Sequence, residues 1–370
     1  MKLHFRSTLL LVNPTRTPRA VRRMQKILKD ASGVDLVITT SKEDFVERVR
    51  AFTAGSYRYL LIWGGDGTAH DAMNALFSTS GADDDTQASL PIEQFKGIGF
   101  LRGGTGNGIQ DSYSVPYRLR PQLEAFADSI QNDLTLDVDL LEARDGARTV
   151  YGQLIGVGAD AEILKKRDQL ATVRRNGQEH VRSGLRYYVR AGFRVLLGKG
   201  FSRRERFKLL LNDGRYAFSG LRVNAQFPFD SLELTRSPFM IEIGTRPYYG
   251  KLLRICPDVV CNNGACDVYV FDFRNRRDIL GNAWYIWTGR HGRINRLRAR
   301  TNRAVIERYE VKSIELISET PFRYHIDGEL VEPRAGRRGE PYRLNIRVLP
   351  QSMRFIVPRA FYNIFHPFER

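Results

Sequence analysis

The sequence predicts a two-domain protein of the α/β plus β class, with an N-terminal doubly wound α/β domain followed by a β-rich antiparallel domain. At 370 residues the chain is too long for one ordinary hydrophobic core. Apolar runs alternate with helical patterns up to about residue 134, and from there short apolar runs follow one another with few helices between them. We therefore expect an α/β domain at 1–134, a β-rich domain at 135–350 and a C-terminal segment at 351–370 that docks on the body.

The first domain should contain parallel strands joined by helices. In the helical stretch 42–52, Phe45, Val49 and Phe52 fall on one side, as in an amphipathic helix. Ligands of doubly wound sheets bind beyond the carboxyl ends of the strands, so Asn13, Thr40 and 64–68 are candidates for one shared edge. The predicted strands are 9–12, 34–38, 59–63 and 97–101, and the predicted helices are about 20–30, 42–52 and 69–77.

A glycine-rich turn at Gly64 to Thr68 connects the third strand to the third helix, with three glycines in five residues. Without Cβ atoms in the way, the backbone N–H groups can close around an anion, and the N-terminus of the following helix adds partial positive charge. Asp66 is the unusual residue, because a carboxylate beside phosphates is repelled unless a metal ion or a proton transfer lies between them. We interpret Asp66 as a partner of a magnesium-bound nucleotide; the alternative is a turn in which Asp66 caps the next helix.

A second glycine-rich turn, Gly103 to Gly108, directly follows the fourth strand and has four glycines in six residues. Two such turns at successive strand ends favour an extended phosphate chain as the ligand. Thr105 in this turn has two equal interpretations, a hydroxyl donated to a phosphate or a cap of the next helix.

The second domain should be built mainly from short antiparallel strands. Two helical insertions are expected, at about 180–197 and 278–289. The predicted strands are 136–141, 151–157, 207–211, 221–225, 239–243, 252–255, 268–271, 313–317, 323–326 and 344–348.

The formal charge of +17 is concentrated in two regions. Residues 165–208 carry a net charge of +11 and residues 274–308 one of +8, so the rest of the chain is slightly acidic. This pattern indicates a polyanionic partner, either anionic lipid or nucleic acid. In the first region Arg182, Arg186, Arg190 and Arg194 recur every four residues beside an apolar stripe. Such a helix can lie on an anionic bilayer, or it can pack its apolar side on the sheet and leave the arginines in solvent.

Composition also suggests a compartment. No apolar run reaches the roughly 18 residues of a membrane-spanning helix, and the apolar stretch near the start is too short for a signal peptide. We expect a cytoplasmic protein that is peripheral at the membrane. Cys256, Cys261 and Cys266 have no histidine near them in sequence, which favours buried reduced thiols over a zinc site.

Near the end of the chain, Asp327-Gly328-Glu329 places two carboxylates around a glycine. Alternate residues of an extended segment face the same way, so these two carboxylates are expected to project together. Such a pair can hold a metal, bind a ribose or deprotonate an alcohol; the alternative is an ordinary polar hairpin.

Together these motifs resemble the diacylglycerol kinase catalytic-domain family, which includes bacterial lipid kinases and the sphingosine and ceramide kinases and is more distantly related to NAD kinase. The resemblance implies a nucleotide-binding domain similar to that of NAD kinase, a β-rich lipid-substrate domain and an active site in the cleft between them. The matching motifs, in chain order, are Asn13-Pro14, Gly64 to Thr68 (GGDGT), Gly104 to Asn107, Gly156 to Glu162, Cys256-Pro257 with Asn263-Gly264, and Asp327-Gly328-Glu329 (DGE).

The resemblance also assigns roles to residues, with ATP and Mg²⁺ as cofactors. Glu329 would accept the proton of the lipid hydroxyl, and Asp66 and Asp327 are the other catalytic candidates. A structural magnesium site would involve Val260, Asn263 and Ala265. The ATP site would be lined by Asn13, Thr40 (or Thr39), Gly64, Gly65, Asp66, Gly67, Thr68, Asp71, Gly104 and Thr105.

Four positions affect this assignment. Asp71 and Gly108 stand where the family usually has Glu and Asp, and Asn263 replaces the Asp of the magnesium site. Glu162 lies where sphingosine kinases carry an acid for the lipid head.

We expect a lipid kinase acting on diacylglycerol, with three alternatives: a sphingoid-base or ceramide kinase, a kinase of a soluble substrate such as NAD, or a silent binder of anionic lipid or nucleic acid. The expected partners are the lipid substrate and an anionic membrane contacted through 165–208 and 274–308; no obligate protein partner is expected, and a homodimer is left open.

Overall fold

The structure, a computed structural model, forms two compact units, which are described one at a time. Unit 1 comprises residues 1–140 and 349–370, and unit 2 comprises residues 141–348. The division falls inside β5 (Thr135–Asp145), a strand that the sequence assigned as a whole to the second domain. The described residues are 2–13, 17–52, 54–78, 95–104, 106–146, 148–175, 178–181, 184–198, 204–218, 225–250, 252–273, 275–299, 306–332 and 340–368.

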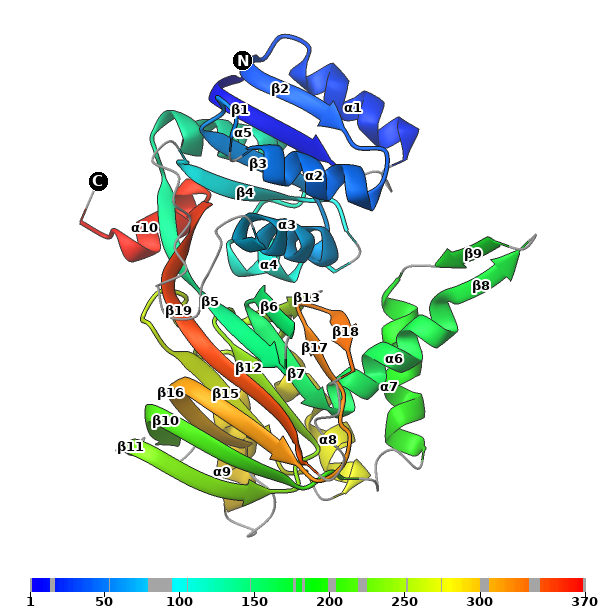
Figure 1. The fold of residues 1–370 in the computed structure, drawn as a ribbon, viewed down its shortest axis with the longest axis vertical. Helices are drawn as coiled ribbons and strands as arrows, with labels where there is room; N and C mark the ends of the chain where they lie inside the picture. Colours follow the sequence, from blue (N-terminus) through cyan, green and yellow to red (C-terminus); the bar gives the residue numbers. More distant parts are fainter. Residues whose placement is uncertain are drawn as a thin grey trace. The chain divides into compact units, whose positions relative to one another are not determined.

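Unit 1 contains a parallel sheet in the order β2-β1-β3-β4, with helices on both of its faces (Figure 1). The end of β19 (Tyr342–Ile356) adds a further parallel strand, with Phe355 paired to Ile98 of β4. The other elements of the unit are β1 His4–Val12, α1 Pro18–Leu28, β2 Ser32–Ile38, α2 Lys42–Phe52, β3 Tyr59–Gly64, α3 Asp66–Ser78, β4 Gly97–Arg102, α4 Gly108–Ser112, α5 Leu119–Gln131 and α10 Arg359–Phe365.

The core of unit 1 explains why its strands read as apolar runs. β3 lies between β1 and β4 and every residue of it is buried, as expected for an inner strand covered on both faces. Met24 of α1 and Phe126 of α5 pack on one face of the sheet, in a cluster with Leu10 and Leu61. The apolar side of α2, formed by Phe45, Val49 and Phe52, is buried as its spacing predicts.

The C-terminal segment is part of unit 1. The Phe361 ring lies 5.2 Å from the Tyr113 ring, edge to face, and the Ser129 hydroxyl donates to the Val357 carbonyl at 2.7 Å. Arg359 pairs with Asp128 of α5 at 2.9 Å. These contacts hold α10 against α5.

Unit 2 is built around antiparallel strands in the order β18-β17-β7-β12-β15-β16-β19, with β10 pairing with both β16 and β11, and β5 with β6. Its strands, besides β5 and β19, are β6 Arg148–Gly152, β7 Leu154–Gly158, β8 Thr172–Arg175, β9 Gln178–Val181, β10 Phe207–Phe218, β11 Ala225–Arg236, β12 Met240–Gly244, β13 Tyr248–Gly250, β14 Leu253–Arg254, β15 Cys266–Phe271, β16 Ile306–Ser318, β17 Tyr324–Ile326 and β18 Glu329–Val331. Its helices are α6 Ala159–Ala171, α7 Leu185–Leu197, α8 Arg276–Trp287 and α9 His291–Ala299.

Two helices of unit 2, α6 and α9, and the strands β8 and β9 were not predicted, the predicted helix 180–197 begins only at Leu185, and one strand lies elsewhere. α6 and α9 are rich in charged residues, so their apolar periodicity is weak. The edge strand β11 begins at Ala225, where the predicted strand 221–225 ends, and 221–224 lie outside the described residues. Figure 1 shows α6 running out to the β8–β9 hairpin and α7 returning from it.

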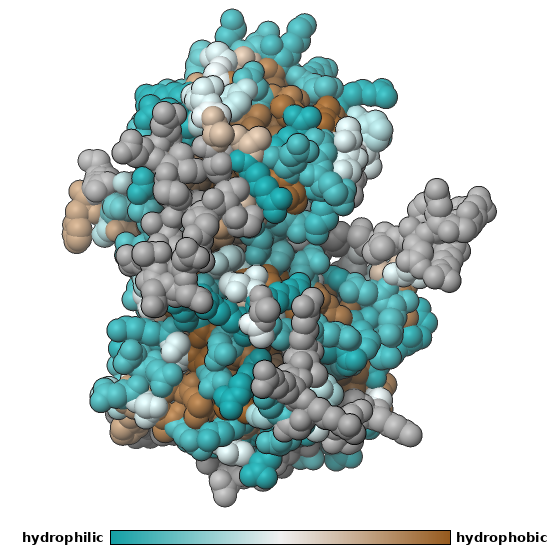
Figure 2. Space-filling model, in the orientation of Figure 1, coloured by the Kyte–Doolittle hydropathy of each residue, from teal (hydrophilic) through white to brown (hydrophobic). Residues whose placement is uncertain are grey.

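Two expectations from composition can be compared with the structure. The three cysteines are free and buried, which confirms the prediction of reduced core thiols. Among the described residues, every helix is too short or too polar to span a bilayer. On the face shown in Figure 2, hydrophilic residues predominate and apolar residues emerge between them in separate patches.

Candidate functional site

The carboxyl ends of the parallel strands of unit 1 bring the predicted nucleotide residues to one edge of the sheet. Asn13 follows β1, Thr40 follows β2 and Gly64 ends β3. The Asn13 side-chain amide donates to the Thr68 hydroxyl at 2.7 Å, and the Asn13 backbone N–H donates to the Trp63 carbonyl. Asn13 and the first glycine turn, which are distant in sequence, are therefore directly connected.

The two glycine turns pack backbone against backbone. A Cβ on Gly104 would lie 2.3 Å from the Gly65 Cα, and one on Gly64 would lie 2.4 Å from the Thr68 Cβ. The Gly103 N–H donates to the Gly64 carbonyl at 2.7 Å. Glycine is thus required here for the contact between the turns as well as for any ligand. Thr105, predicted to line the same site, lies outside the described residues.

Asp66 joins the two turns. Its Oδ1 accepts a hydrogen bond from the Ile109 N–H at 3.0 Å, in the first turn of α4. A Cβ on Gly106 would lie 2.3 Å from its Oδ2. Asn107, at φ 66°, closes the second turn by bonding both the N–H and the carbonyl of Gly104. Asp66 therefore accepts a hydrogen bond from α4, the helix that follows the second turn. This hydrogen bond helps to position the second turn, independently of any contact between Asp66 and a ligand.

Thr40 and Asp71 interact with the N-terminal turn of α2. The Thr40 N–H and hydroxyl both donate to Asp44 Oδ2, at 2.7 and 3.1 Å. Asp71 Oδ1 lies 2.8 Å from Lys42 Nζ. Thr39 is buried and its hydroxyl donates to the Val12 carbonyl, whereas Thr40 is exposed, so Thr40 is the threonine available at this edge.

Unit 2 contains an apolar pocket of about 300 Å³ among α6, α7, α8 and the strands β12 and β14. Its walls include Ile163, Phe193 and Trp287. At one place the apolar lining is interrupted by Asp160 and Glu242. The pocket therefore suits a molecule with a hydrocarbon part and a polar part.

Asp160, Glu242 and His325 form a cluster beside this pocket, with their ligating atoms within 4.8 Å of one another. His325 Nδ1 accepts from the Gly328 N–H at 3.4 Å, so its Nε2 carries the proton and donates to Asp160 Oδ2. Glu242 is 1% exposed, and neither of its oxygens has a hydrogen-bond donor among the described residues. Burial, and after it the Asp160 carboxylate, raises the pKa of Glu242 well above its usual range.

The expectation that Asp327 and Glu329 project together is wrong. Asp327 at φ 51° and Gly328 at φ 90° form a two-residue hairpin turn between β17 and β18, which interrupts the alternation of an extended chain. Asp327 is buried, lies 3.0 Å from Arg246 Nη2 and accepts the N–H groups of Gln153 and Leu154. Glu329 is exposed. Asp327 anchors the hairpin, and of the two carboxylates Glu329 is the one that a substrate can reach.

Glu162, the predicted acid for the lipid head, is separate from the pocket lining. Its Oε1 pairs with Arg323 at 2.9 Å on the surface. Asp160, two residues earlier on α6, faces the pocket instead, because residues two apart project from different sides of a helix. Glu242 was also missed, although a single acid within the apolar strand Met240–Gly244 was a usable signal.

The predicted structural magnesium site does not fit Mg²⁺. Asn263 Oδ1 accepts the Ala265 N–H at 3.2 Å, as in a polar turn. Val260 is 44% exposed. Two carbonyls and an amide provide no negative charge, whereas Mg²⁺ sites normally include a carboxylate.

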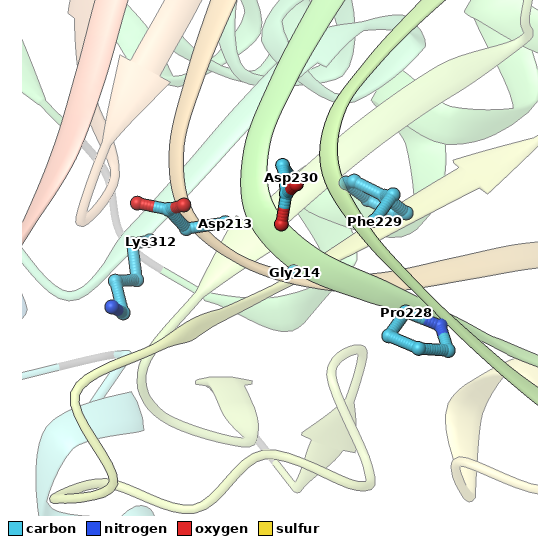
Figure 3. Close-up of a pocket in the computed structure, with 6 residues that line it drawn as sticks. All are labelled: Asp213, Gly214, Pro228, Phe229, Asp230 and Lys312. Carbon is cyan, nitrogen blue, oxygen red and sulfur yellow. The ribbon is translucent and has the colours of Figure 1, made fainter.

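A second hollow, of about 500 Å³, lies on the strands β10, β11 and β16 (Figure 3). Asp213, Asp230 and Lys312 line it together with Gly214, Pro228 and Phe229. None of the predicted site residues lines it.

Comparison with known proteins gives one match to the N-terminal part of the chain and several to the fold of nearly the whole chain. Residues 7–143 match the family model described as "Diacylglycerol kinase catalytic domain". A solved structure of a diacylglycerol kinase from Bacillus anthracis str. Sterne is 15% identical with a TM-score of 0.60, covering 96% of this chain and 98% of that one. Two further structures from the same strain are 17% and 15% identical with TM-scores of 0.60 and 0.61, covering 96% of this chain and 99% of each. None of the curated proteins compared with the chain matches it.

These findings confirm two predictions. The α/β plus β fold class is that of the matched structures, which at these identities establish the fold alone. The resemblance to the diacylglycerol kinase catalytic-domain family is confirmed by the match over residues 7–143. That match supports a kinase-type function for the domain that holds both glycine turns.

Proposed function

We propose that this protein is an ATP-dependent kinase that phosphorylates the hydroxyl group of a membrane lipid. The observation that carries this proposal is the pocket of unit 2, which is apolar along most of its wall and acidic at Asp160 and Glu242. A soluble nucleotide substrate would require polar walls, whereas a lipid alcohol requires apolar walls with polar groups where its head lies.

The glycine turns of unit 1 support ATP as the phosphoryl donor. The first N–H groups of α3 have no acceptors inside the helix and carry partial positive charge, which suits phosphate oxygens. Mg²⁺ bound to the nucleotide would neutralise charge that develops during transfer. We propose that Asp66 Oδ2 faces this ion, while Asp66 Oδ1 holds the second turn through the Ile109 N–H.

Glu329 is the proposed proton acceptor for the lipid hydroxyl. Its exposed position supports this role better than that of Asp327, whose carboxylate is fully used inside unit 2. The hairpin that carries Glu329 also carries His325, which donates to Asp160 beside the pocket. A carboxylate at this place can take the hydroxyl proton as the new P–O bond forms.

An exposed apolar ridge on α7 supports a role at the membrane surface. Val189, Phe193 and Leu197 are 47%, 51% and 63% exposed, at intervals of four, while Ala191, Val195 and Leu196 are buried. The helix therefore packs one side and exposes a second apolar side. The exposed arginines Arg186, Arg190 and Arg194 border this ridge, and Arg182 lies outside the described residues.

The second basic region contributes a similar feature. Leu280 and Trp284 of α8 are 50% and 66% exposed, and Leu280 and Phe193 both line the pocket. Apolar side chains flanked by arginines match the acyl and headgroup layers of an anionic bilayer. We propose that the protein acts at the cytoplasmic membrane surface, with lipid entering the pocket beside this ridge.

The membrane proposal can be tested by replacing Arg186, Arg190 and Arg194 with Gln. At about 1 kcal/mol per arginine, binding to anionic vesicles should fall on the order of 100-fold, with little change on neutral vesicles. The matched control replaces Arg19, Arg22 and Arg23 of α1, which are also exposed. Equal losses in the two triple variants would contradict a docking role for α7.

The kinase proposal is tested with labelled ATP, Mg²⁺ and a panel of acceptors: diacylglycerol, a ceramide, a long-chain amino alcohol and NAD. Diacylglycerol is the acceptor expected from the sequence. We expect label in a lipid product and none in NAD. Turnover of NAD without lipid, or ATP binding without transfer to any acceptor, would reject the proposal.

A further inference from the structure

Arg102 lies directly before the second glycine turn and belongs to none of the motifs named above. It ends β4, and its backbone is held on both sides. Its N–H donates to the Gln122 side chain at 2.7 Å, and its carbonyl accepts from Trp63 Nε1 at 2.8 Å. Gln122 belongs to α5, and Trp63 lies in β3 next to the first glycine turn. The start of the second turn is therefore fixed to two neighbouring elements.

The Arg102 side chain connects to the far end of the same turn. Its Nη1 donates to Asp111 Oδ1 at 2.5 Å, and its Nε donates to the Val115 carbonyl at 2.7 Å. The guanidinium also lies over the Tyr117 ring, 4.2 Å from the ring centroid. Asp111 is in α4, the short helix that follows the turn. Arg102 thus joins the residue before the turn to the helix after it, and we call this set of contacts the Arg102 clamp.

The two charges of the clamp are buried, with side chains that are 9% exposed for Arg102 and 2% exposed for Asp111. A buried ion pair is an inefficient source of stability, because the loss of hydration offsets most of the attraction between the charges. Its advantage is geometry, since the donors of a guanidinium form a rigid planar fork that holds its acceptors at set positions. At this low exposure the guanidinium acts on the turn rather than on a nucleotide.

The second turn needs such support because of its composition. Four of its six residues are glycine, which loses more conformational freedom on ordering than any other residue. A loop that samples many shapes binds its ligand weakly, since only the fraction in the binding shape is competent. The hydrogen bond from the Ile109 N–H to Asp66 restrains the turn from the side of the first turn. The Arg102 clamp is a second and independent restraint on the same segment.

We propose that the Arg102 clamp is a positioning device, which keeps the second glycine turn in its ATP-binding shape before the nucleotide arrives. The inference rests on the function proposed above, in which this turn binds the phosphates of ATP. Without the clamp, ATP itself must order the turn, so part of the interaction free energy is lost to ordering. The affinity for ATP therefore falls. The rate at saturating ATP is kept, because the bound nucleotide restores the same shape.

The test uses the double variant Arg102→Gln/Asp111→Asn, which removes both charges and leaves neither of them buried alone. Thermal unfolding checks that the variant folds. We expect the Kd of Mg-ATP, measured by calorimetry, to rise about 10-fold, as for a competent fraction of about one tenth. With a lipid acceptor, the KM for ATP should rise by a similar factor while kcat stays within about twofold. In the control, Asp128→Asn removes a carboxylate that pairs with Arg359, and both constants should be unchanged.

Hydrogen exchange measures the restraint on the turn directly and needs no substrate. In the nucleotide-free double variant, the amides of residues 103–110 should exchange at least about 10-fold faster than in the unmodified protein, and saturating Mg-ATP should remove the difference. If the clamp only stabilised unit 1 as a whole, exchange would also accelerate in β1 and β3. The inference is overturned by that general acceleration, by unchanged exchange at 103–110, by an unchanged Kd for ATP, or by a fall in kcat beyond about twofold.

These results are separable from failure of the proposed function. Transfer of label to a lipid, together with unchanged exchange in the double variant, would remove only this inference. Faster exchange and weaker ATP binding in the double variant, with no transfer to any acceptor by the unmodified protein, would remove the proposed function and leave the clamp.

Discussion

The glycine turns of unit 1 and the acidic pocket of unit 2 are built in opposite ways. The turns are made of backbone from two short segments, 64–68 and 103–108, each directly after a strand. The acids of the pocket are side chains from α6 and β12, Asp160 and Glu242, and His325 of β17 lies beside them; these elements are far apart in sequence. A site made of backbone requires glycine at consecutive positions and is therefore visible in the sequence. A site made of side chains depends on which strands become neighbours.

The two regions also treat carboxylates differently. Asp66 in unit 1 has a backbone donor, the Ile109 N–H, and Asp327 in unit 2 has an arginine and two N–H groups. Glu242 has neither kind of partner among the described residues. Of the motif carboxylates, Asp66 and Asp327 therefore also hold the fold together, whereas Glu242, which no motif identifies, is buried without such a partner in the described part of the chain.

Removal of the Asp327 carboxylate should have the largest effect on stability. In Asp327→Ala, Arg246 remains buried without its partner, and breaking a buried pair costs about 3–5 kcal/mol of the free energy of unfolding. Denaturant unfolding measures this loss. Glu329→Gln, at the exposed end of the same turn, should leave stability unchanged and abolish transfer. A stable, inactive Asp327→Ala protein would restore Asp327 as a catalytic residue.

Two substitutions at Asp66 separate charge from position. Asp66→Asn keeps an oxygen for the Ile109 N–H and removes the charge, so we expect normal folding and a loss of phosphoryl transfer of about 100-fold or more. Asp66→Ala should lose transfer and also roughly 1–3 kcal/mol of stability. Substantial turnover in Asp66→Asn would show that Asp66 only positions the loops.

The contact between the glycine turns predicts a steric effect. In Gly104→Ala the new Cβ would lie 2.3 Å from the Gly65 Cα, and backbone cannot yield as a side chain can. The turns must separate, at a cost of about 1–3 kcal/mol and with weaker ATP binding. In the control Gly281→Ala, the Cβ meets no atom within 4 Å on a helix, so stability should be unchanged or slightly higher. Unchanged ATP affinity in Gly104→Ala would contradict the close packing of the turns.

His291 predicts a smaller effect that depends on pH. Burial lowers the pKa of His291 to about 4 from an ordinary value of 6.5. Between these values the unfolded chain binds the proton and the folded chain does not, so folding loses stability as the pH falls below 6.5. Asp267 acts in the opposite sense, because burial raises its pKa to about 6 and its folded form takes up a proton more readily.

The histidine contribution is isolated by comparison with His291→Leu. From pH 7 to pH 5.5 the unmodified protein should lose about 1 kcal/mol of unfolding free energy relative to this variant. Parallel stability curves for the two proteins would show that His291 is protonated normally in the fold.

The sequence predicted the backbone-made part of the molecule well. The strands before both glycine turns and helix α3 follow from apolar runs and punctuation by glycine, whereas α4 and α5 were not predicted; the parallel order then brings Asn13 to Thr68. The pocket could not be predicted to the same extent. Asp160 and Glu162 were indistinguishable until α6 fixed which side of the helix each occupies, and α6 itself is too rich in charged residues to show a clear apolar period. The prediction that Asp327 and Glu329 project together was wrong because Asp327 and Gly328 both have positive φ and form a turn. Side chains in a turn do not alternate between two faces as they do in a strand.

Filling the pocket tests the central claim most directly. Gly192 of α7 lines the pocket, and a Cβ placed there meets no atom within 4 Å, so the side chain of Gly192→Leu can start into the cavity from an open position. Gly281→Leu adds the same side chain to α8 at a position that does not line the pocket. We predict that transfer of labelled phosphate from ATP to lipid falls at least about 10-fold in Gly192→Leu, with ATP affinity unchanged, and stays normal in Gly281→Leu. Equal lipid phosphorylation by the two variants would contradict the account.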